Sequence, residues 1–353
     1  MLRRILIATD AWHPQVNGVV RTLENTIREL IRLGHEVMVI EPSGYERWPI
    51  PFYPEIELCY PRQGPLYRAM REFRPDTIHI STEGPIGLAV RRVCIRKNWR
   101  FTTSYHTKFP EYLHKMLKVP LTVGYMYMRW FHKPSRNLMT ATQSLEIELY
   151  RRGFSNNIVR WSRGVDLSLF YPRPRTYPDR DRPILMYVGR LSKEKNLDAF
   201  LSLKNPGTKY VVGDGPYRET LQQRYPEAKF LGYLQGDELA EAFSNADVFV
   251  FPSKTDTFGL VLIEAMACGC PAAAYPVVGP HDIIENDQLG ALHEDLGKAV
   301  ELALRRGNRD ACVRHAQKFT WENCTRQFVA NLVHTHDRHH SGGRPAWSQP
   351  RKA

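Results

Sequence analysis

Short apolar runs of strand length alternate with helical patterns along almost the whole chain, and this alternation most constrains its fold. After the apolar run Ile5–Thr9 and a loop, residues 22–33 place leucine and isoleucine at helical spacing until Gly34 ends the pattern. Further strands are predicted in two series. The first comprises Val37–Ile40, Thr77–Ser81, Phe101–Tyr105, Leu138–Thr142 and Ile158–Trp161, and the second comprises Ile184–Val188, Tyr210–Val212, Phe230–Leu231, Val248–Phe251, Ala272–Tyr275 and Ala291–Leu292.

Strands that are separated by helices favour parallel sheets, because a parallel connection needs a crossover that a helix supplies. Adjacent strands lack the Asn-Gly or Asp-Gly pair that marks a tight hairpin. We therefore expect an α/β protein built from doubly wound, Rossmann-like domains with parallel sheets.

A proline-rich stretch divides the chain into two halves. Residues 171–183 contain four prolines and no apolar periodicity, which is typical of a linker. A chain of 353 residues is suited to two domains. We predict an N-terminal domain at 1–170 and a C-terminal domain at 184–319, facing each other across a cleft. A helix at 320–336 should pack back toward the N-terminal domain, and 337–353 should form a disordered tail.

The composition excludes several classes of protein. Hydrophobic residues make up 42% of the chain and charged residues 24%, which excludes a mostly disordered or collagen-like protein. The apolar runs are far shorter than the roughly 20 residues that span a bilayer, and Ile5–Thr9 is too short for a signal peptide. Six scattered cysteines without metal-ligand spacing indicate reduced core thiols. We expect a cytoplasmic location, with peripheral association at the inner membrane face left open.

The positive charge is concentrated in the first half of the chain. The net charge is +12, and residues 1–175 carry 27 basic and 15 acidic side chains, whereas 176–353 carry 22 of each. The stretch between residues 112 and 136 combines cationic side chains with aromatic ones. Such a segment suits an anionic membrane interface, and it equally suits a solvated helix face above a buried aromatic side. A nucleic-acid partner is disfavoured, because no zinc finger or RNA-recognition signature is present.

Ligands of open parallel sheets bind where strand ends meet helix N-termini, and four such loops hold candidate residues. The first loop, Trp12–Val19, offers Gly18, whose backbone amide can approach a ligand closely. The second, Ser104–Thr107, offers His106, which can donate a hydrogen bond to a sugar hydroxyl or a phosphate. Taken alone, each feature is also what an ordinary turn or a structural hydrogen bond requires.

The third loop combines two cations. Arg190 and Lys195 follow the strand Ile184–Val188 and can neutralise a diphosphate, and Gly213–Pro216 forms a second tight turn after the next strand. The chain has neither the Gly-x-Gly-x-x-Gly sequence of dinucleotide sites nor the Walker P-loop sequence. We therefore predict a diphosphate site of another kind.

The fourth loop is the most specific. Within Ser253–Gly269, Asp256 lies in the loop, Gly259 opens the following helix, and Glu264 lies inside that helix. Two carboxylates and the exposed amides of a helix start can hold a ligand with many hydroxyl groups, because hydroxyls donate to charged acceptors. A helix cap with an ion-paired glutamate explains any one of these residues, but not the whole string.

The string from Ser253 resembles the glutamate-x7-glutamate motif of retaining family 4 glycosyltransferases with the GT-B fold. The Asn-Gly-Val loop at Asn17, the Ser-Tyr-His-Thr segment, Gly164–Phe170 and the Gly-Arg-Leu-Ser-x-Glu-Lys-Asn sequence from Gly189 follow in that family's order. The resemblance covers residues 5–335 and is greatest to the bacterial branch with phosphatidylinositol mannosyltransferases and glycosyl- or sulfoquinovosyl-diacylglycerol synthases. It implies transfer of a hexose from a nucleotide sugar by two Rossmann-like domains.

The resemblance also implies roles for individual residues. The donor diphosphate would contact Arg190 and Lys195, the ribose would contact Glu264, and the hexose would contact Asp256. The family motif begins with glutamate, so the shorter side chain of Asp256 leaves the placement or identity of the sugar open. The predicted donor-binding residues are Gly18, Arg190, Lys195, Gly213, Asp256, Phe258, Gly259, Leu260 and Glu264, the predicted acceptor-binding residues are Asn17, His106 and Lys108, and the predicted catalytic residues are His106, Arg190, Lys195 and Asp256.

The predicted activity is that of a retaining hexosyltransferase that uses a UDP- or GDP-hexose and a hydroxyl acceptor such as diacylglycerol or phosphatidylinositol. Two cations at the diphosphate remove the need for a metal, and the Asp-x-Asp sequence at Asp179–Asp181 lies in the linker. No cofactor is predicted, and the oligomeric state is open. The alternatives are a transferase with a soluble or polysaccharide acceptor, a nucleotide-sugar epimerase, a basic nucleotide- or nucleic-acid-binding protein, and a catalytically silent nucleotide-sugar sensor.

Overall fold

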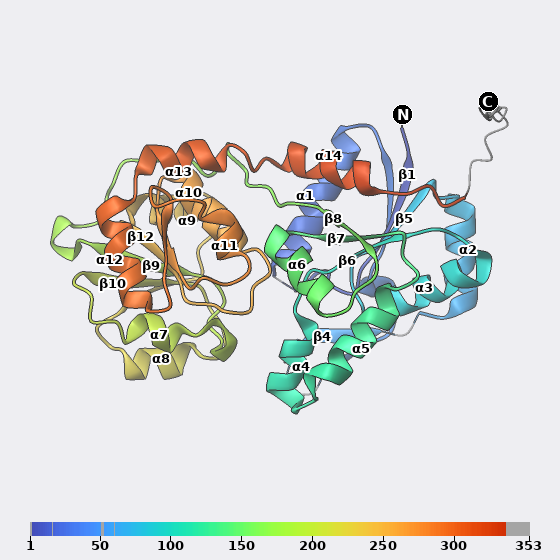
Figure 1. Ribbon diagram of the computed structural model, residues 1–353, viewed down its shortest axis with the longest axis horizontal. Helices are drawn as coiled ribbons and strands as arrows, with labels where there is room; N and C mark the ends of the chain where they lie inside the picture. Colours follow the sequence, from blue (N-terminus) through green and yellow to red (C-terminus); the bar gives the residue numbers. More distant parts are fainter. Residues whose placement is uncertain (1, 16, 51–52, 60, 337–353) are drawn as a thin grey trace, which may run out of the picture.

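Two six-stranded parallel sheets form the two halves of the molecule, which lie side by side in Figure 1. The computed structural model describes residues 2–336 except residues 16, 51–52 and 60. The predicted disordered tail at 337–353 lies outside the described residues. All the strands predicted from the sequence are present, so the predicted α/β class with two doubly wound sheets is confirmed.

The N-terminal sheet has the strand order β2-β1-β5-β6-β7-β8, and each neighbouring pair is parallel. Helices connect these strands. The strands are β1 (Arg4–Ala8), β2 (Glu36–Ile40), β5 (Thr77–Ile80), β6 (Thr102–Ser104), β7 (Asn137–Thr140) and β8 (Asn157–Arg160). The helices are α1 (Gly18–Arg32), α2 (Gln63–Phe73), α3 (Pro85–Lys97), α4 (Phe109–Leu117), α5 (Leu121–His132) and α6 (Gln143–Arg151), with a 3-10 turn at Pro42–Gly44.

The C-terminal sheet has the strand order β11-β10-β9-β12-β13-β14 and is also parallel. Its strands are β9 (Ile184–Val188), β10 (Thr208–Val212), β11 (Lys229–Gly232), β12 (Val248–Phe251), β13 (Ala272–Ala274) and β14 (Gly290–Leu292). The helices are α7 (Leu197–Leu201), α8 (Arg218–Arg224), α9 (Gly236–Asn245), α10 (Leu260–Ala267), α11 (Pro280–Ile283), α12 (Leu296–Arg306), α13 (Arg309–Ala316) and α14 (Trp321–Asn331), with 3-10 turns at Asp179–Asp181 and Lys193–Lys195.

Helices cover both faces of each sheet, which explains why the strands are continuous apolar runs. Alternate side chains of a strand point to opposite faces. Ile5 and Ile7 of β1 pack in a buried cluster with α1 and α14, whereas Leu6 and Ala8 pack in another with α2 and α3. The side chains of β9 divide between two clusters in the same way.

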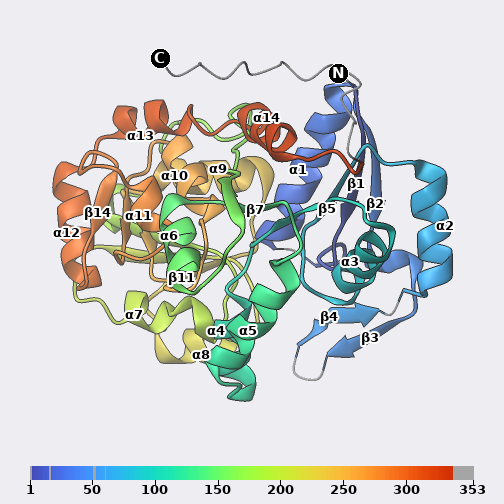
Figure 2. The ribbon, with the colours of Figure 1, turned by 45° about the vertical axis from the view of Figure 1, so that its right-hand side comes forward.

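An antiparallel hairpin of β3 (Arg47–Ile50) and β4 (Tyr53–Cys59) is a feature that the sequence analysis does not predict. Proline disfavours an inner strand because it has no N–H group for the ladder. A two-stranded sheet has only edge strands, so Pro49 and Pro54 are compatible with this pairing. The hairpin forms a sheet of its own, below the N-terminal sheet in Figure 2.

The C-terminal helix α14 crosses to the N-terminal domain and lies along α1 (Figure 1). Its Phe328 is fully buried in the cluster that contains Ile5 and Ile7 of β1. The helix ends at Asn331, before the predicted limit of 336. The next residues are extended beside β5, where the backbone N–H of Thr335 donates to the carbonyl oxygen of Asp76 at 2.8 Å. Backbone pairing with the sheet therefore replaces the last helical turn.

The proline-rich segment 171–183 is held against the C-terminal domain by hydrogen bonds to α9. Asp181 is buried, accepts a hydrogen bond from Tyr210 at 2.6 Å, and pairs with Lys229 at 2.5 Å. Asp179 lies 3.3 Å from Arg182. Both carboxylates of the Asp-x-Asp sequence are thus paired with cations of the protein itself.

The basic and aromatic segment at 112–136 forms α4 and α5, and each of its two interpretations describes part of it. Tyr125 and Phe131 are buried, whereas Trp130 and Lys133 are exposed. The segment therefore has a buried aromatic side and an exposed side that carries both apolar and cationic groups.

Two predictions from composition can be compared with the structure. All six cysteines are buried thiols, so the predicted core role is confirmed. Of the helices in the described ranges, none combines the length and the apolarity needed to cross a bilayer.

Candidate active site

The strand order of the C-terminal sheet brings two loops to one place. β9 lies between β10 and β12, so the strand order runs from β9 toward β11 on one side and toward β14 on the other. Ligands of such sheets bind beside the carboxyl ends of the strands where the order reverses. The loop after β9 carries Lys195, and the loop after β12 carries Asp256. Lys195 Nζ and Asp256 Oδ1 are 2.6 Å apart. The fold thus unites two predicted site residues that lie far apart in the sequence.

Asp256 is a partly buried carboxylate with one oxygen engaged. Burial raises its pKa, but the charge of Lys195 and the hydrogen bond from Lys195 outweigh burial, so the pKa lies below its usual value. Asp256 is therefore ionised at neutral pH. Its Oδ2 atom is buried and has no hydrogen-bond partner among the described residues. A ligand hydroxyl at Oδ2 would satisfy a group that is otherwise costly to bury.

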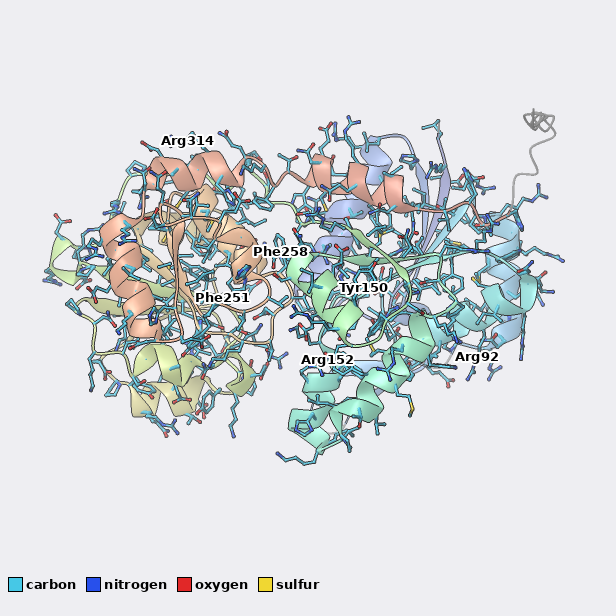
Figure 3. The ribbon with its side chains drawn as sticks, viewed as in Figure 1. Arg92, Tyr150, Arg152, Phe251, Phe258 and Arg314 are labelled. Carbon is cyan, nitrogen blue, oxygen red and sulfur yellow. The ribbon has the colours of Figure 1, made fainter. Side chains whose placement is uncertain are left out.

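Helix α10 begins next to Asp256. Gly259 precedes the helix with φ +89°, a left-handed conformation that glycine adopts without strain, and no side chain caps the first turn. The amides of Leu260 and Val261, the first two of α10, therefore have no intrahelical acceptor and are available to an anion, whereas the Leu262 N–H donates to the Gly259 carbonyl oxygen at 2.9 Å. Phe258 packs in the domain core beside Phe319, and Figure 3 places Phe258 and Phe251 in the same domain. Phe258 thus anchors the junction between loop and helix.

Helix α1 of the N-terminal domain faces α10. A Cβ atom added to Gly18 would lie 3.7 Å from Leu260 Cδ1, so these two predicted donor-binding residues are neighbours. One turn along α1, Arg21 Nη2 lies 2.5 Å from Glu264 Oε1. The Glu264 side chain is only 4% exposed, and its Oε2 atom has no partner in the described part of the chain. Glu264 is thus in the same state as Asp256, with one oxygen on a cation and the other without a partner.

His106 joins this group from the N-terminal domain. Its carbonyl oxygen accepts a hydrogen bond from Thr257 Oγ1 at 2.6 Å. Its Nδ1 lies 3.0 Å from Arg163 Nη2, and because arginine can only donate, Nδ1 accepts and the ring proton lies on Nε2. Nε2 is buried, and no described residue accepts its proton. Burial and the charge of Arg163 hold the pKa of His106 well below its ordinary value, so the ring is neutral. We call Lys195, Asp256, Glu264 and His106 the interdomain site.

A glycine contact supports the loop after β9. Gly213 has φ +134°, and a Cβ atom on it would lie 1.9 Å from the carbonyl oxygen of Gly189. Gly189 in turn donates its N–H to the Val212 carbonyl at 3.0 Å. Gly213 therefore acts on the predicted diphosphate loop through close backbone packing.

Two family models match most of the chain. The model described as Glycosyltransferase Family 4 matches residues 16–169, and that described as Glycosyl transferases group 1 matches 173–317. The sulfoquinovosyl transferase SQD2 of Arabidopsis thaliana is 31% identical over 78% of this chain, which spans 60% of that protein. A GDP-mannose-dependent alpha-mannosyltransferase of Mycobacterium tuberculosis is 32% identical, covering 82% of this chain and 83% of that protein. The chain belongs to the family 4 glycosyltransferases.

The fold of this glycosyltransferase matches a solved structure over nearly its whole length. Sucrose-phosphate synthase from Thermosynechococcus elongatus superposes with a TM-score of 0.74 at 20% identity, covering 93% of this chain and 98% of that one. The likeness establishes the two-domain GT-B arrangement that the sequence resemblance implied.

Three further residues of the glycosyltransferase that the sequence predicts for the site differ in their neighbours and exposure: Asn17, Lys108 and Arg190. Asn17 caps α1, and its Oδ1 accepts from two amides of the first turn at 3.0 and 3.1 Å. Lys108 Nζ pairs with Glu148 Oε2 at 2.7 Å. Arg190 is exposed shortly after the end of β9. Acceptor binding by Asn17 or Lys108 stays a prediction.

Sequence reasoning missed three side chains that shape the site of this glycosyltransferase: Arg21, Arg163 and Thr257. Arg21 stands three residues after Gly18, and helical periodicity alone indicates that both share a face of α1. Arg163 has no such signal, because 57 positions separate it from His106 and no local pattern links them. Thr257 lay inside the recognised string, but its bond to the other domain depends on how the two domains meet.

Proposed function

We propose that this glycosyltransferase moves a hexose from a UDP- or GDP-hexose to a lipid hydroxyl at an anionic membrane surface, with retention of anomeric configuration. The observation that carries the proposal is a set of three buried polar atoms without partners in the described chain: Asp256 Oδ2, Glu264 Oε2 and His106 Nε2. Buried polar atoms are hydrogen-bonded in the great majority of cases. Two acceptors and one donor around one site suit a ligand rich in hydroxyl groups.

The leaving group in this reaction is the nucleoside diphosphate. Cleavage of the bond between the anomeric carbon and the phosphate oxygen leaves negative charge on the diphosphate and positive charge on the sugar. Arg190 and Lys195 would stabilise the diphosphate with fixed positive charge, which is most effective where water is excluded. The amides at the start of α10 would add further donors. We assign no metal ion and no cofactor to this step.

The two carboxylates would bind the sugars of the donor. Each keeps one oxygen on a cation, Lys195 for Asp256 and Arg21 for Glu264, and this contact orients the other oxygen. Glu264 would accept hydrogen bonds from ribose hydroxyls and Asp256 from hexose hydroxyls. Because Asp256 is ionised at neutral pH, its hydrogen bonds to the hexose would be charge-assisted.

His106 would contribute a neutral hydrogen-bond donor near the anomeric carbon. Its Nδ1 is engaged by Arg163 and its pKa is depressed, so the ring is poorly suited to accept the acceptor's proton. In the proposed reaction the departing phosphate oxygen takes that proton. The acceptor oxygen then bonds to the face of the anomeric carbon that the phosphate leaves, which gives retention.

An exposed face of α5 supports a lipid acceptor. Val123, Met126 and Trp130 recur at helical spacing, and their side chains are 47%, 59% and 49% exposed. Lys118 and Lys133 are exposed at either end of this helix. Apolar side chains flanked by cations bind anionic bilayer surfaces, where each cation contributes about 1 kcal/mol. We propose that α5 holds the enzyme at the surface that contains its acceptor.

A transfer assay tests the donor site. The assay uses labelled UDP- and GDP-hexoses with diacylglycerol or phosphatidylinositol in vesicles, starting with GDP-mannose because of the mannosyltransferase relative. Arg190→Ala and Glu264→Ala should each abolish transfer while the circular dichroism spectrum stays unchanged. Transfer that survives in both variants would refute the assignment of the donor site.

Vesicle co-sedimentation tests the membrane surface separately. The double variant Met126→Ser and Trp130→Ser should bind anionic vesicles less than the wild type at low salt. Tyr233→Ser is the matched control, because Tyr233 is an aromatic residue of the C-terminal domain that is at least as exposed as Trp130. Wild-type protein that stays in the supernatant, or product formed only with a soluble acceptor, would overturn the lipid acceptor and leave the donor site standing.

A further inference from the structure

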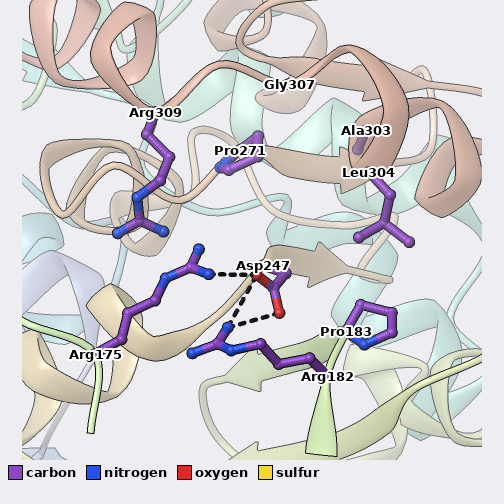
Figure 4. Close-up of a pocket in the computed structure, with 9 residues that line it drawn as sticks. All are labelled: Arg175, Arg182, Pro183, Asp247, Pro271, Ala303, Leu304, Gly307 and Arg309. Carbon is purple, nitrogen blue, oxygen red and sulfur yellow. Dashed lines mark hydrogen bonds and ion pairs between the residues drawn. The ribbon is translucent and has the colours of Figure 1, made fainter. Parts of the chain in front are cut away.

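A charged pocket of about 410 Å³ lies at the other edge of the C-terminal sheet from the interdomain site. It is lined by Pro183 and Asp247, which directly precede β9 and β12, whereas Lys195 and Asp256 follow those strands. Three arginines also line it, two from the segment 171–183 and one from the start of α13. Figure 4 shows their guanidinium groups on the side of Asp247 that is away from Ala303 and Leu304.

Asp247 is the carboxylate that lines the pocket, and two of the three guanidinium groups pair with it. Asp247 Oδ1 lies 2.9 Å from Arg175 Nη1, and the two Asp247 oxygens accept from Arg182 Nη1 at 3.0 and 2.9 Å. Asp247 also accepts from the N–H of Ile184 at 2.8 Å, so both of its carboxylate oxygens have hydrogen-bond donors. Arg309 donates to three backbone carbonyl oxygens at the ends of α9 and α10, which carry no formal charge.

Positive charge therefore exceeds negative charge in this pocket. Asp179 lies 3.3 Å from Arg182 Nε, but its side chain is 99% exposed and screened by water. Arg182 Nη2 is buried, and none of the described residues accepts a hydrogen bond from it. Burial and the neighbouring charge of Arg175 lower the pKa of Arg309. Arg175 and Arg309 thus repel each other, and the buried Nη2 donor of Arg182 lacks an acceptor.

We propose that this pocket binds the phosphoryl group of a phosphate monoester. A phosphate dianion would offset the excess charge and accept hydrogen bonds from Arg175, whose side chain is 36% exposed, since guanidinium groups fit phosphate oxygens well. The pocket has the volume of a small-molecule site rather than of a single ion. Ala303 and Leu304 give it an apolar wall for the organic part of the ligand. A soluble sugar phosphate and the headgroup of phosphatidic acid present the same chemistry.

The site would tie together parts of the chain that meet at the domain boundary. Arg175 and Arg182 belong to the segment between the two sheets, and Arg309 belongs to α13, which packs against α10 of the interdomain site. A ligand that bridges them would hold this segment against the C-terminal domain. The proposal does not depend on the transfer reaction, because it rests on residues at the opposite sheet edge.

Isothermal titration of the full chain with glycerol 3-phosphate tests the proposal. We expect saturable binding, a higher melting temperature, and at least about tenfold weaker binding in Arg175→Ala and in Arg175→Glu, as expected for loss of one charge-assisted contact. Arg180→Ala, which removes an exposed arginine of the same segment, should bind like the wild type. Circular dichroism verifies that each variant is folded.

Two comparisons decide where the phosphate binds and what carries it. Because phosphate can also enter the donor site, Lys195→Ala is titrated in parallel, and binding lost there but retained in both Arg175 variants would overturn the proposal. Vesicles with phosphatidic acid are compared with vesicles of phosphatidylglycerol. Arg175-dependent binding of glycerol 3-phosphate supports a soluble ligand, and Arg175-dependent binding of phosphatidic acid vesicles alone supports a lipid headgroup. Absence of Arg175-dependent binding in both arms would overturn the proposal.

Discussion

The two ring nitrogens of His106 have different surroundings, and amide substitutions can test them one at a time. In His106→Asn, the side-chain oxygen can take the position of Nδ1 and accept from Arg163, but nothing replaces the Nε2–H donor. In His106→Gln, the longer amide can bring an N–H group toward the Nε2 position, while the acceptor for Arg163 is lost. The two variants therefore separate a contact with substrate from a contact that stabilises the fold.

The structure sets the size of each effect. Arg163 is only 5% exposed and donates to Trp161 O at 2.6 Å, Ser162 O at 3.0 Å and His106 Nδ1 at 3.0 Å. Loss of one acceptor from a buried charged group costs about 1–3 kcal/mol, so His106→Gln should lower the free energy of unfolding by that amount. Loss of a hydrogen bond to a charged transition state costs about 1.5–3 kcal/mol, so His106→Asn should lower kcat/KM by roughly tenfold to a hundredfold.

Urea unfolding and steady-state kinetics of both variants give the answer. We expect His106→Asn to unfold like the wild type with a reduced kcat/KM, and His106→Gln to unfold more easily while keeping more of its kcat/KM. The rate should show no titration of this ring near neutral pH, because its pKa is held well below the ordinary value. Wild-type kcat/KM in His106→Asn would refute the donor role, and wild-type stability in His106→Gln would refute the bond to Arg163.

Three further predictions concern stability. His79 is fully buried, and burial lowers its pKa from 6.5 to about 3, so only the unfolded chain takes up its proton between those values. Stability should therefore fall by about 3 kcal/mol between pH 7 and pH 4, and His79→Gln should remove this slope in urea titrations. Asp10 acts in the opposite direction, because burial raises its pKa to about 6; stability should fall as the pH rises from 4 to 6, and an unchanged slope in Asp10→Asn would contradict this. Gly213→Ala should lower the free energy of unfolding by at least about 3 kcal/mol, because its Cβ atom would lie 1.9 Å from a carbonyl oxygen, whereas Gly236→Ala, with φ +57° and open space, should cost only about 1 kcal/mol.

Local sequence determined the two sheets and part of the site. A strand that is buried on both faces must be apolar at consecutive positions, so runs such as Ile5–Thr9 mark strands without any knowledge of their neighbours. Lys195 and Asp256 were recognised because each follows a strand, and parallel strands end at one edge of their sheet. The hairpin of β3 and β4 escaped recognition because prolines in its strands argue against an inner strand and say nothing of a two-stranded one.

Only the tertiary structure decided which charged groups meet. Arg21 binds Glu264 across 243 positions, and this contact exists because α1 and α10 face each other from different domains. The arginine pocket likewise needs the segment 171–183 to fold back onto the edge of the C-terminal sheet. The local sequence around a charged side chain is the same whether that side chain is solvated or ion-paired, because the packing of distant elements decides which partner it meets. Apolar periodicity therefore reveals the strands and helices, whereas the ion pairs depend on how distant strands and helices pack together.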